Sequence, residues 1–212
     1  KSTNKYAIVD LEATSASSTA CIIQVGIVIM QNGRVIDEFA SDVNPHQKLD
    51  NHIVHLTGIT DQQLSQAPDF SEIARTIFEL IEDCIFVAHN VKFDANLLAE
   101  ALFMEGFELR TPRVDTVELA QVFYPTLEQY NLSYLSRVLN LDLAQAHTAI
   151  EDARATGKLL LHLMDKIASL PRQTIDMLLT FSDNLLFESE LVIRDAIKGK
   201  TNSLSKEYIM LE

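Results

Sequence analysis

Three extended segments open the chain, each marked by a run of apolar, mostly β-branched residues. They cover Tyr6–Leu11, Cys21–Met30 and Val35–Val43, and the turn signal Gln31-Asn32-Gly33 joins the last two. An Asn-Gly pair between two such runs is typical of a tight β-hairpin loop. The pattern therefore predicts an antiparallel meander at the start of the fold.

After these segments, the spacing of apolar residues changes from the period of a strand to that of a helix. Apolar residues recur at helical spacing from Ile73 to Ile81, after Ser71, which is a candidate N-cap. A short apolar run, Cys84–Ala88, predicts a buried strand. Helical segments follow this strand at Phe93–Phe107, Val117–Phe123 and Asn131–Leu141.

A long helix is expected near the end of the pattern. Thr148-Ala149-Ile150-Glu151 has the form of a capping box, and the helix that it starts should end near Leu170, before Pro171. A meander followed by alternating strands and helices predicts an α/β fold with a mixed sheet between helical layers. We expect residues 1–170 to form one domain. Residues 171–212 are expected to form a helical extension or a linker to a further domain.

Composition narrows the class of protein. The 212 residues are 47% hydrophobic and 22% charged, which excludes wholesale disorder. The longest apolar runs are too short to span a bilayer, and the opening residues do not resemble a signal peptide. The only two cysteines, Cys21 and Cys84, indicate buried reduced thiols, as expected of a cytoplasmic protein.

The net charge argues against a broad electropositive surface. Seventeen basic residues stand against 30 acidic ones, which gives a formal net charge of −13. Such a chain repels polyanions over most of its surface. A polyanion bound here would need help from metal ions.

Candidate chemistry lies at three element boundaries. Asp10 and Glu12 are two positions apart at the end of the first strand, so their side chains should point to the same side. Two such carboxylates repel each other unless a cation lies between them. Taken alone, the pair is equally compatible with two solvated acids at a strand end.

The second and third boundaries are also ambiguous when taken singly. Asp94 falls at the start of the helix after the strand Cys84–Ala88, where open α/β sheets place ligands, although an acid there also complements the helix dipole. His147 lies just outside the long helix, and Asp152 is one position beyond its capping Glu151. Both could face one cleft, although a lone histidine is more often simply at the surface.

The order of these segments changes their meaning. Asp-x-Glu on the first strand, His89-Asn90-x-x-Phe93-Asp94 after a later strand, and His147-x-x-x-x-Asp152 at a late helix together resemble the DEDDh (DnaQ-like) 3′→5′ exonuclease superfamily. Between them, the segments 55–60 (HLTGIT), 114–120 (VDTVELA) and 131–135 (NLSYL) are similar to further family motifs. The resemblance covers about residues 6–170.

The resemblance implies an RNase H-like fold with a mixed five-stranded sheet and two divalent ions, Mg²⁺ or Mn²⁺. The implied catalytic residues are Asp10, Glu12, Asp94, His147 and Asp152, the four carboxylates being the metal ligands. This agrees with the preference of Mg²⁺ for oxygen ligands and with the near-neutral pKa that suits histidine as a general base. The implied reaction is hydrolysis from the 3′ end with release of 5′-mononucleotides.

The family match also implies contacts to the 3′-terminal nucleotide. The corresponding positions are Ala13, Thr14, Leu56, Thr57, Asn90 and Phe93. Leu56 and Phe93 could instead be plain core residues. Two positions depart from the family pattern, because Ser15 stands where glycine is common and Gln24 where an acid is frequent.

Three questions stay open at this point. The substrate is expected to be single-stranded or frayed DNA, but RNA 3′ ends are an alternative, because no motif reads the 2′-hydroxyl. A catalytically silent module that binds nucleic acid or a partner is a second alternative. The resemblance further implies covalent fusion to a helicase of the DinG type or to a polymerase. A role in proofreading, repair or end trimming is not specified.

Overall fold

A five-stranded mixed sheet forms the centre of the molecule. The computed structural model describes residues 4–141 and 147–198. The strands are β1 (Lys5–Ala13), β2 (Ile22–Gln31), β3 (Arg34–Asp42), β4 (Ile85–Ala88) and β5 (Arg113–Asp115). They lie in the order β3-β2-β1-β4-β5, with β1, β2 and β3 antiparallel and β4 and β5 parallel to β1. The predicted α/β fold is confirmed.

The predicted hairpin joins β2 to β3. Asn32 and Gly33 both have positive φ, 53° and 75°, and Gln31 pairs with Arg34 across the turn. Two consecutive left-handed residues match the right-handed twist of the strands that they connect. The Asn-Gly signal is therefore sufficient to place this turn.

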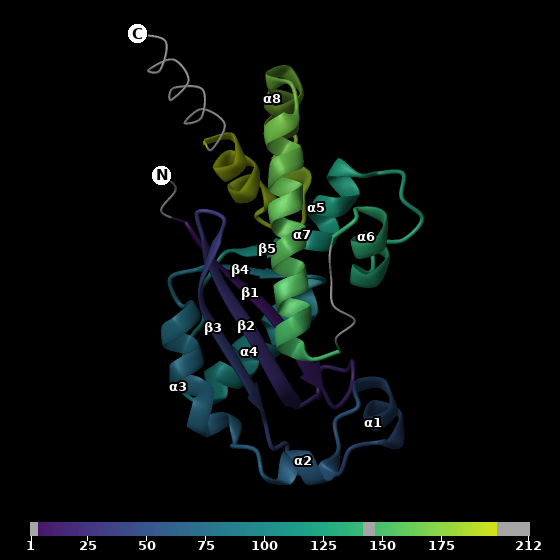
Figure 1. The fold of residues 1–212 in the computed structure, drawn as a ribbon. Helices are drawn as coiled ribbons and strands as arrows, with labels where there is room; N and C mark the ends of the chain where they lie inside the picture. The colour runs from purple at the N-terminus through teal and green to yellow at the C-terminus, as the bar shows by residue number, and fades with distance from the viewer. Residues whose placement is uncertain (1–3, 142–146, 199–212) are drawn as a thin grey trace.

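Helices surround the sheet on both faces (Figure 1). They are α1 (Asn51–Thr57), α2 (Asp61–Ser65), α3 (Phe70–Ile81), α4 (Val91–Met104), α5 (Thr116–Phe123), α6 (Leu132–Val138), α7 (Ala149–Ser169) and α8 (Arg172–Thr180), followed by the 3-10 turn η1 (Ser182–Asn184). Residues 189–198 are also helical.

The alternation of side chains along β1 divides the core into two layers. Ile8 belongs to an apolar cluster with residues of α5, α6 and α7, whereas Val9 belongs to a cluster with residues of α3 and α4. The long helix α7 crosses the first of these faces, packed on β1 and β2 (Figure 1). Since Asp10 and Glu12 continue the alternation of Ile8, they point toward the α7 side.

Several local details differ from expectation. Helix α3 is capped by Asp69, through a capping box with Glu72, and not by Ser71, which lies inside the helix. Helix α4 starts at Val91, two residues before the predicted start. The short helices α1 and α2 were not predicted. Both cysteines are free, but only Cys84 is buried, and Cys21 is half-buried.

The residues after Pro171 pack on the sheet-facing helices. Ile175, Val192 and Ile193 are at most 1% exposed and join the same apolar cluster as Ile8. The Tyr6 hydroxyl on β1 donates a hydrogen bond to buried Asp195. The division at residue 170 remains a prediction, but residues 172–198 share the core of the sheet.

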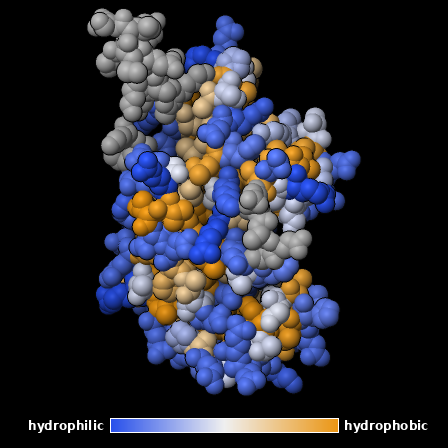
Figure 2. Space-filling model, in the orientation of Figure 1, coloured by the Kyte–Doolittle hydropathy of each residue, from blue (hydrophilic) through white to orange (hydrophobic). Residues whose placement is uncertain are grey.

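The surface is mostly hydrophilic, with apolar side chains in separate patches (Figure 2). Val35 and Ile36 on the edge strand β3 are each about half exposed. Within residues 4–141 and 147–198, every helix is too short or too polar to cross a membrane.

Candidate active site

The end of β1 carries the first two acids of the site. Asp10 lies opposite Gly26 of β2 and Glu12 opposite Gln24, and the register shifts just after Glu12. Each of Asp10, Glu12 and Asp152 offers a ligand atom within 4.8 Å of those of the others. The structure thus brings together residues 142 positions apart in sequence.

Asp10 is the most constrained member of this cluster. Its Oδ2 atom is fully buried and has no hydrogen-bond partner in the described part of the chain. Burial raises the pKa of the Asp10 carboxyl well above its usual range, and the charges of Asp94, Glu12 and Asp152 raise it further. A buried carboxylate without a partner requires a cation or a proton.

The pKa values of the neighbouring acids are raised in the same way. Burial, with a smaller contribution from the Asp152 charge, raises the pKa of Glu12 to about 7. Burial also raises the pKa of Asp152, although nearby His147 lowers it in part. In each case the ionised form is penalised, as expected where several carboxylates share one site without a counterion.

Asp94 lies beside this cluster in the first turn of α4. It is 5% exposed, and its Oδ1 accepts a hydrogen bond of 3.0 Å from the backbone N–H of Leu11 on β1. Burial raises the pKa of Asp94 to about 8, despite the stabilisation by that N–H. Asp94 therefore links α4 to the strand that carries the other acids.

The turn before α4 depends on a second acid. Asn90 has a left-handed backbone (φ 75°), which asparagine tolerates better than most residues. Its N–H donates to Asp115 Oδ1, which also accepts from Val117 N–H at the start of α5. Asp115 therefore caps α5 and fixes the turn before α4.

Three interactions hold the start of α7 at the sheet. Thr148 accepts the Glu151 N–H through its side chain, as an N-cap, and donates its hydroxyl to the Glu151 carboxylate. Gln24 on β2 accepts the Ala149 N–H (2.8 Å). A Cβ atom on Gly26 would lie 2.3 Å from the Ala149 carbonyl carbon, so only glycine allows this approach. These contacts bring Asp152 to Asp10 and Glu12.

His147 lies immediately before α7 and is exposed. It lines a cavity of about 940 Å³ together with Asp10 and Asp152. Its side chain therefore faces the same solvent-filled space as the acid cluster. Such a position allows a histidine to exchange protons with a molecule in the cavity.

The donor set fits a divalent metal ion. Asp10, Glu12 and Asp152 offer only carboxylate oxygens, which are the ligands that Mg²⁺ and related hard cations prefer. A cation would also satisfy the buried Asp10 Oδ2 atom. Asp94 stands beside this set with one oxygen already engaged by Leu11 N–H.

The predicted nucleotide contacts lie outside the lining of this cavity. Leu56 is 68% exposed at the end of α1, which excludes the core alternative for it, whereas Phe93 is half-buried against the core of the α4 face. Thr57 donates to Ile53 O and accepts from Ile59 N–H.

The remaining contact positions lie at turns. Thr14 accepts the Cys21 N–H through its side chain and donates its own N–H to Cys21 O. Ala13 ends β1, and Asn90 precedes α4. The assignment of these positions to substrate stays a prediction.

The sequence interpretation assigned no role in the site to three residues that shape it. Gly26 and Gln24 position α7. His89 lines the cavity, and its Nε2 lies 2.6 Å from Tyr130 O. The signal for Gly26 was a glycine inside an apolar strand, which often marks close backbone approach. No local signal marks the partners of Gln24 or His89.

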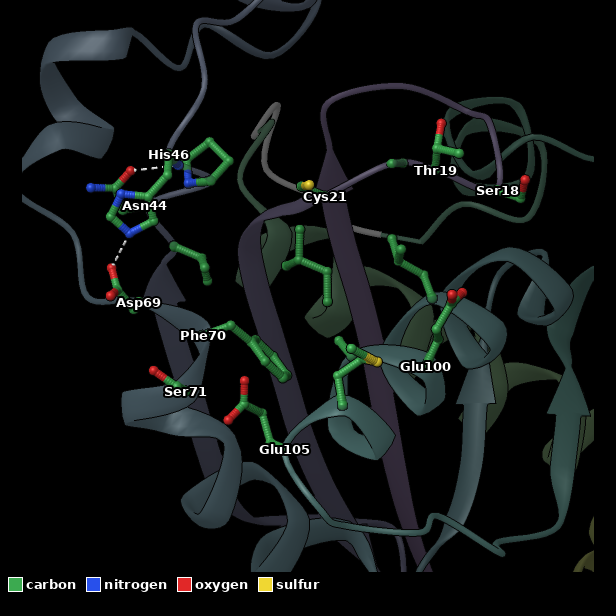
Figure 3. A pocket seen from close by; sticks show the side chains of 17 residues that line it. Ser18, Thr19, Cys21, Asn44, His46, Asp69, Phe70, Ser71, Glu100 and Glu105 are labelled. Carbon is green, nitrogen blue, oxygen red and sulfur yellow. Dashed lines mark hydrogen bonds and ion pairs between the residues drawn. The ribbon is translucent and has the colours of Figure 1, made fainter.

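A second cavity, of about 410 Å³, lies away from the acid cluster between the 18–21 loop, α3 and α4 (Figure 3). His46 contacts Asp69 on one side of it, and Glu100 and Glu105 extend from α4 on the other. None of the predicted catalytic residues lines it.

Comparisons with known proteins agree with this geometry. A sequence profile described as "Exonuclease" matches residues 7–160. The 3′-5′ exonuclease DinG of Staphylococcus aureus (strain USA300) is 38% identical over 210 residues, or 98% of this chain. The chain spans only 23% of the length of that relative.

Solved structures with the same fold are more distant in sequence. Exonuclease I of E. coli in complex with a dA16 oligonucleotide has a TM-score of 0.70 at 15% identity, over 84% of this chain and 43% of that one. The nuclease domain of 3′hExo, a DEDDh family member bound to rAMP, has a TM-score of 0.66 at 16% identity, over 76% and 92%.

The profile match covers most of the chain, and the acids of the resemblance converge at one end of β1. The chain belongs to the exonuclease family.

Proposed function

We propose that this chain removes 5′-mononucleotides from the 3′ ends of single-stranded or frayed DNA, and that Asp10, Glu12, Asp94, Asp152 and His147 carry the reaction. The observation on which the proposal rests is the cluster of Asp10, Glu12 and Asp152 around a buried, unpartnered carboxylate oxygen. Family membership supplies the reaction class.

Asp10, Glu12 and Asp152 would hold two divalent ions, Mg²⁺ or Mn²⁺, with Asp94 completing the set directly or through water. When bound, such ions supply Lewis acidity, which lowers the pKa of water and neutralises charge on the phosphate. Asp10 is central in this scheme, because the charges of the three other acids all act on it.

His147 acts as the general base. It faces the cavity from outside α7 and is exposed, so it can accept the proton of the attacking water and pass it to solvent. Leu56 projects from the end of α1 into solvent. An exposed apolar side chain there suits contact with a terminal base that has been unstacked from its neighbour.

RNA 3′ ends are the second candidate substrate. Solved relatives of the same fold include a 3′-exonuclease described as recognising a histone mRNA stem-loop, and one bound to rAMP, beside the DNA complex of exonuclease I. Matched DNA and RNA oligonucleotides of one sequence, compared by kcat/KM, decide between them.

The whole protein is proposed to be longer than this chain. The DinG relatives are about four times its length, since it covers 23% of each. We propose a covalently linked helicase domain, joined through residues 171–212, of which residues 172–198 pack on the core of this domain.

The experiment uses one oligonucleotide labelled at its 5′ or its 3′ end. With Mn²⁺ or Mg²⁺, the 3′ label should appear at once in mononucleotide, while the 5′-labelled strand shortens stepwise. EDTA should abolish both signals and added metal restore them. Release of the 5′ label first, or turnover that persists in EDTA, would contradict the proposal. If Asp10→Ala changed neither nucleotide release nor the response to Mn²⁺, a catalytically silent binding module would be favoured.

A further inference from the structure

The cavity that holds Asp10 and His147 has a second wall with the opposite charge. α6 and α7 supply it, beside each other in Figure 1, with the residues Ser133, Ser136, Arg137, Arg154 and Lys158. At about 940 Å³ the cavity is near the upper end of the usual range for small-ligand sites, about 300–1,000 Å³. The predicted contacts to the terminal nucleotide lie outside this cavity, so it offers room for another part of the substrate strand.

Arg137 differs from the other two cations of this wall. Arg154 is engaged by Glu38 in a bidentate pair, with N–O distances of 2.9 and 2.6 Å. Lys158 has an interaction of its own. In residues 4–141 and 147–198, no carboxylate forms an ion pair with Arg137. In a chain with a net charge of −13, such a cation is conspicuous.

The surroundings of Arg137 favour an anion. Its guanidinium lies over the Tyr134 ring, 5.4 Å from the centroid, which restricts its motion. Ser133 lies one turn earlier on the same face of α6 and is exposed. Ser136 uses its own hydroxyl hydrogen on Leu132 O. Arg137 and Ser133 are thus the donors that this face presents.

The wall is held rigidly against the sheet. His89 Nε2 must donate to Tyr130 O, because a carbonyl only accepts, and the Tyr130 hydroxyl donates to Tyr124 O (2.6 Å). Leu135 on α6 is fully buried. Arg137 therefore projects from a preorganised element, which lowers the entropic cost of binding.

We propose that Arg137, with Ser133, binds a backbone phosphate of the substrate strand that lies on the 5′ side of the scissile phosphate. Asp10, Asp152 and Arg137 line the same cavity, so a strand cut at the acids can continue along the α6 wall. A guanidinium matches the geometry of a phosphate through two parallel N–H donors. The inference rests on the proposed function, because it takes the cavity as the nucleic-acid site.

The test compares two substrates that differ in this phosphate. Decathymidylate carries further phosphates on the 5′ side of its scissile phosphate, whereas the p-nitrophenyl ester of thymidine 5′-phosphate has the scissile phosphate alone. Arg137→Gln should raise KM for decathymidylate about tenfold. It should leave KM for the ester unchanged. The slope of log KM against log salt should fall by about 0.7. Arg137→Lys should recover part of the loss.

Arg75→Gln is the matched control, because Arg75 is an exposed arginine on α3, across the sheet from the cavity. This variant should leave KM unchanged for both substrates. Equal losses on both substrates for Arg137→Gln, or no loss on either, would overturn the subsite. If the parent chain cleaves neither substrate, the proposed function fails. Anisotropy of labelled decathymidylate then decides the subsite, since equal Kd values for parent and Arg137→Gln reject it.

Discussion

The Asp10 carboxylate is surrounded by charges of its own sign. Burial and the nearby Asp94, Glu12 and Asp152 all penalise its ionised form. Without a cation, the cluster therefore retains protons at a pH where an exposed acid has lost them. The pKa values of Glu12, about 7, and Asp94, about 8, define the pH range over which the cluster loses these protons.

The stability of the metal-free protein should consequently fall as pH rises. The folded chain binds more protons than the unfolded chain between about pH 4 and pH 8, because the folded pKa values of Glu12 and Asp94 are the higher ones. The free energy of unfolding decreases with pH wherever that holds. Asp10→Asn should relieve the repulsion and raise Tm in EDTA at pH 8, by roughly 2–4 °C for each kcal/mol.

Thermal melts at pH 5.5 and pH 8, with EDTA or Mn²⁺, measure this effect. Mn²⁺ should stabilise the parent chain more at pH 8 than at pH 5.5, because its ligands must be deprotonated. It should stabilise Asp10→Asn much less. A parent chain that is more stable at pH 8 than at pH 5.5 in EDTA would contradict the electrostatic account.

His147 should affect turnover without affecting metal binding. Its ring lines the cavity but is not part of the carboxylate set within 4.8 Å. His147→Ala should lower kcat by about 10²–10⁴-fold, the usual contribution of a general base. Calorimetry should find Mn²⁺ affinity unchanged, and full turnover in the variant would refute the assignment.

At the scale of elements, the site depends on how closely α7 approaches β2. Gly26 provides the space, and Gln24 and Thr148 satisfy N–H groups at the start of the helix. Asp152 is one turn into α7, so a displacement of this end moves it away from Asp10 and Glu12. The metal site therefore depends on a position that carries no functional group.

Gly26→Ala is expected to weaken Mn²⁺ binding and turnover together. The new Cβ would lie 2.3 Å from the α7 backbone, which cannot move aside as a side chain end can. We expect a loss of about 10–100-fold in metal affinity, as for changes that disturb the support of ligands. Far-UV circular dichroism should stay close to that of the parent.

Gly157→Ala is the control, because its Cβ would meet the flexible end of Met30 at 3.0 Å and Ile8 Cγ1 at an ordinary contact distance of 3.8 Å. It lies on the same helix and should leave metal affinity within about twofold, since the side chain can adjust. Equal effects of the two substitutions would show that α7 packing, and not its first turn, controls the site.

At the scale of the whole molecule, residues 172–198 complete one core. Glu118 on α5 accepts the N–H of Leu186 and the hydroxyl of Ser189, both at 2.8 Å. Glu188 exchanges hydrogen bonds with the backbone of Arg113 at the edge strand β5. The segment thus covers the free edge of the sheet, which protects it from pairing with other chains.

Unfolding should be cooperative across this boundary. Ile193 is 1% exposed in the core, so Ile193→Ala should lower the free energy of unfolding by about 2–5 kcal/mol in a single transition. Leu186→Ala, at 84% exposure, should change it by less than about 0.5 kcal/mol. Urea melts followed by circular dichroism test both. A separate early transition for Ile193→Ala would indicate an independent extension.

Local patterns were sufficient for much of this protein. The Asn-Gly turn, the capping box at Thr148 and the strand period that places Asp10 and Glu12 on one face all depend on residues within a few positions of each other. Such preferences act through backbone geometry and nearest neighbours, so sequence expresses them directly.

Contacts between distant segments required the tertiary structure. Three features depend on what packs against each position. They are the exposure of Leu56, the residue that caps α3, and the glycine of β2 that lies opposite Asp10. The sequence alone determined the main strands and helices and the acids that they carry, but not the short helices α1 and α2. The tertiary structure decided that Asp152 lies within 4.8 Å of Asp10 and that Arg137 faces the same cavity, because packing between distant elements fixes these separations.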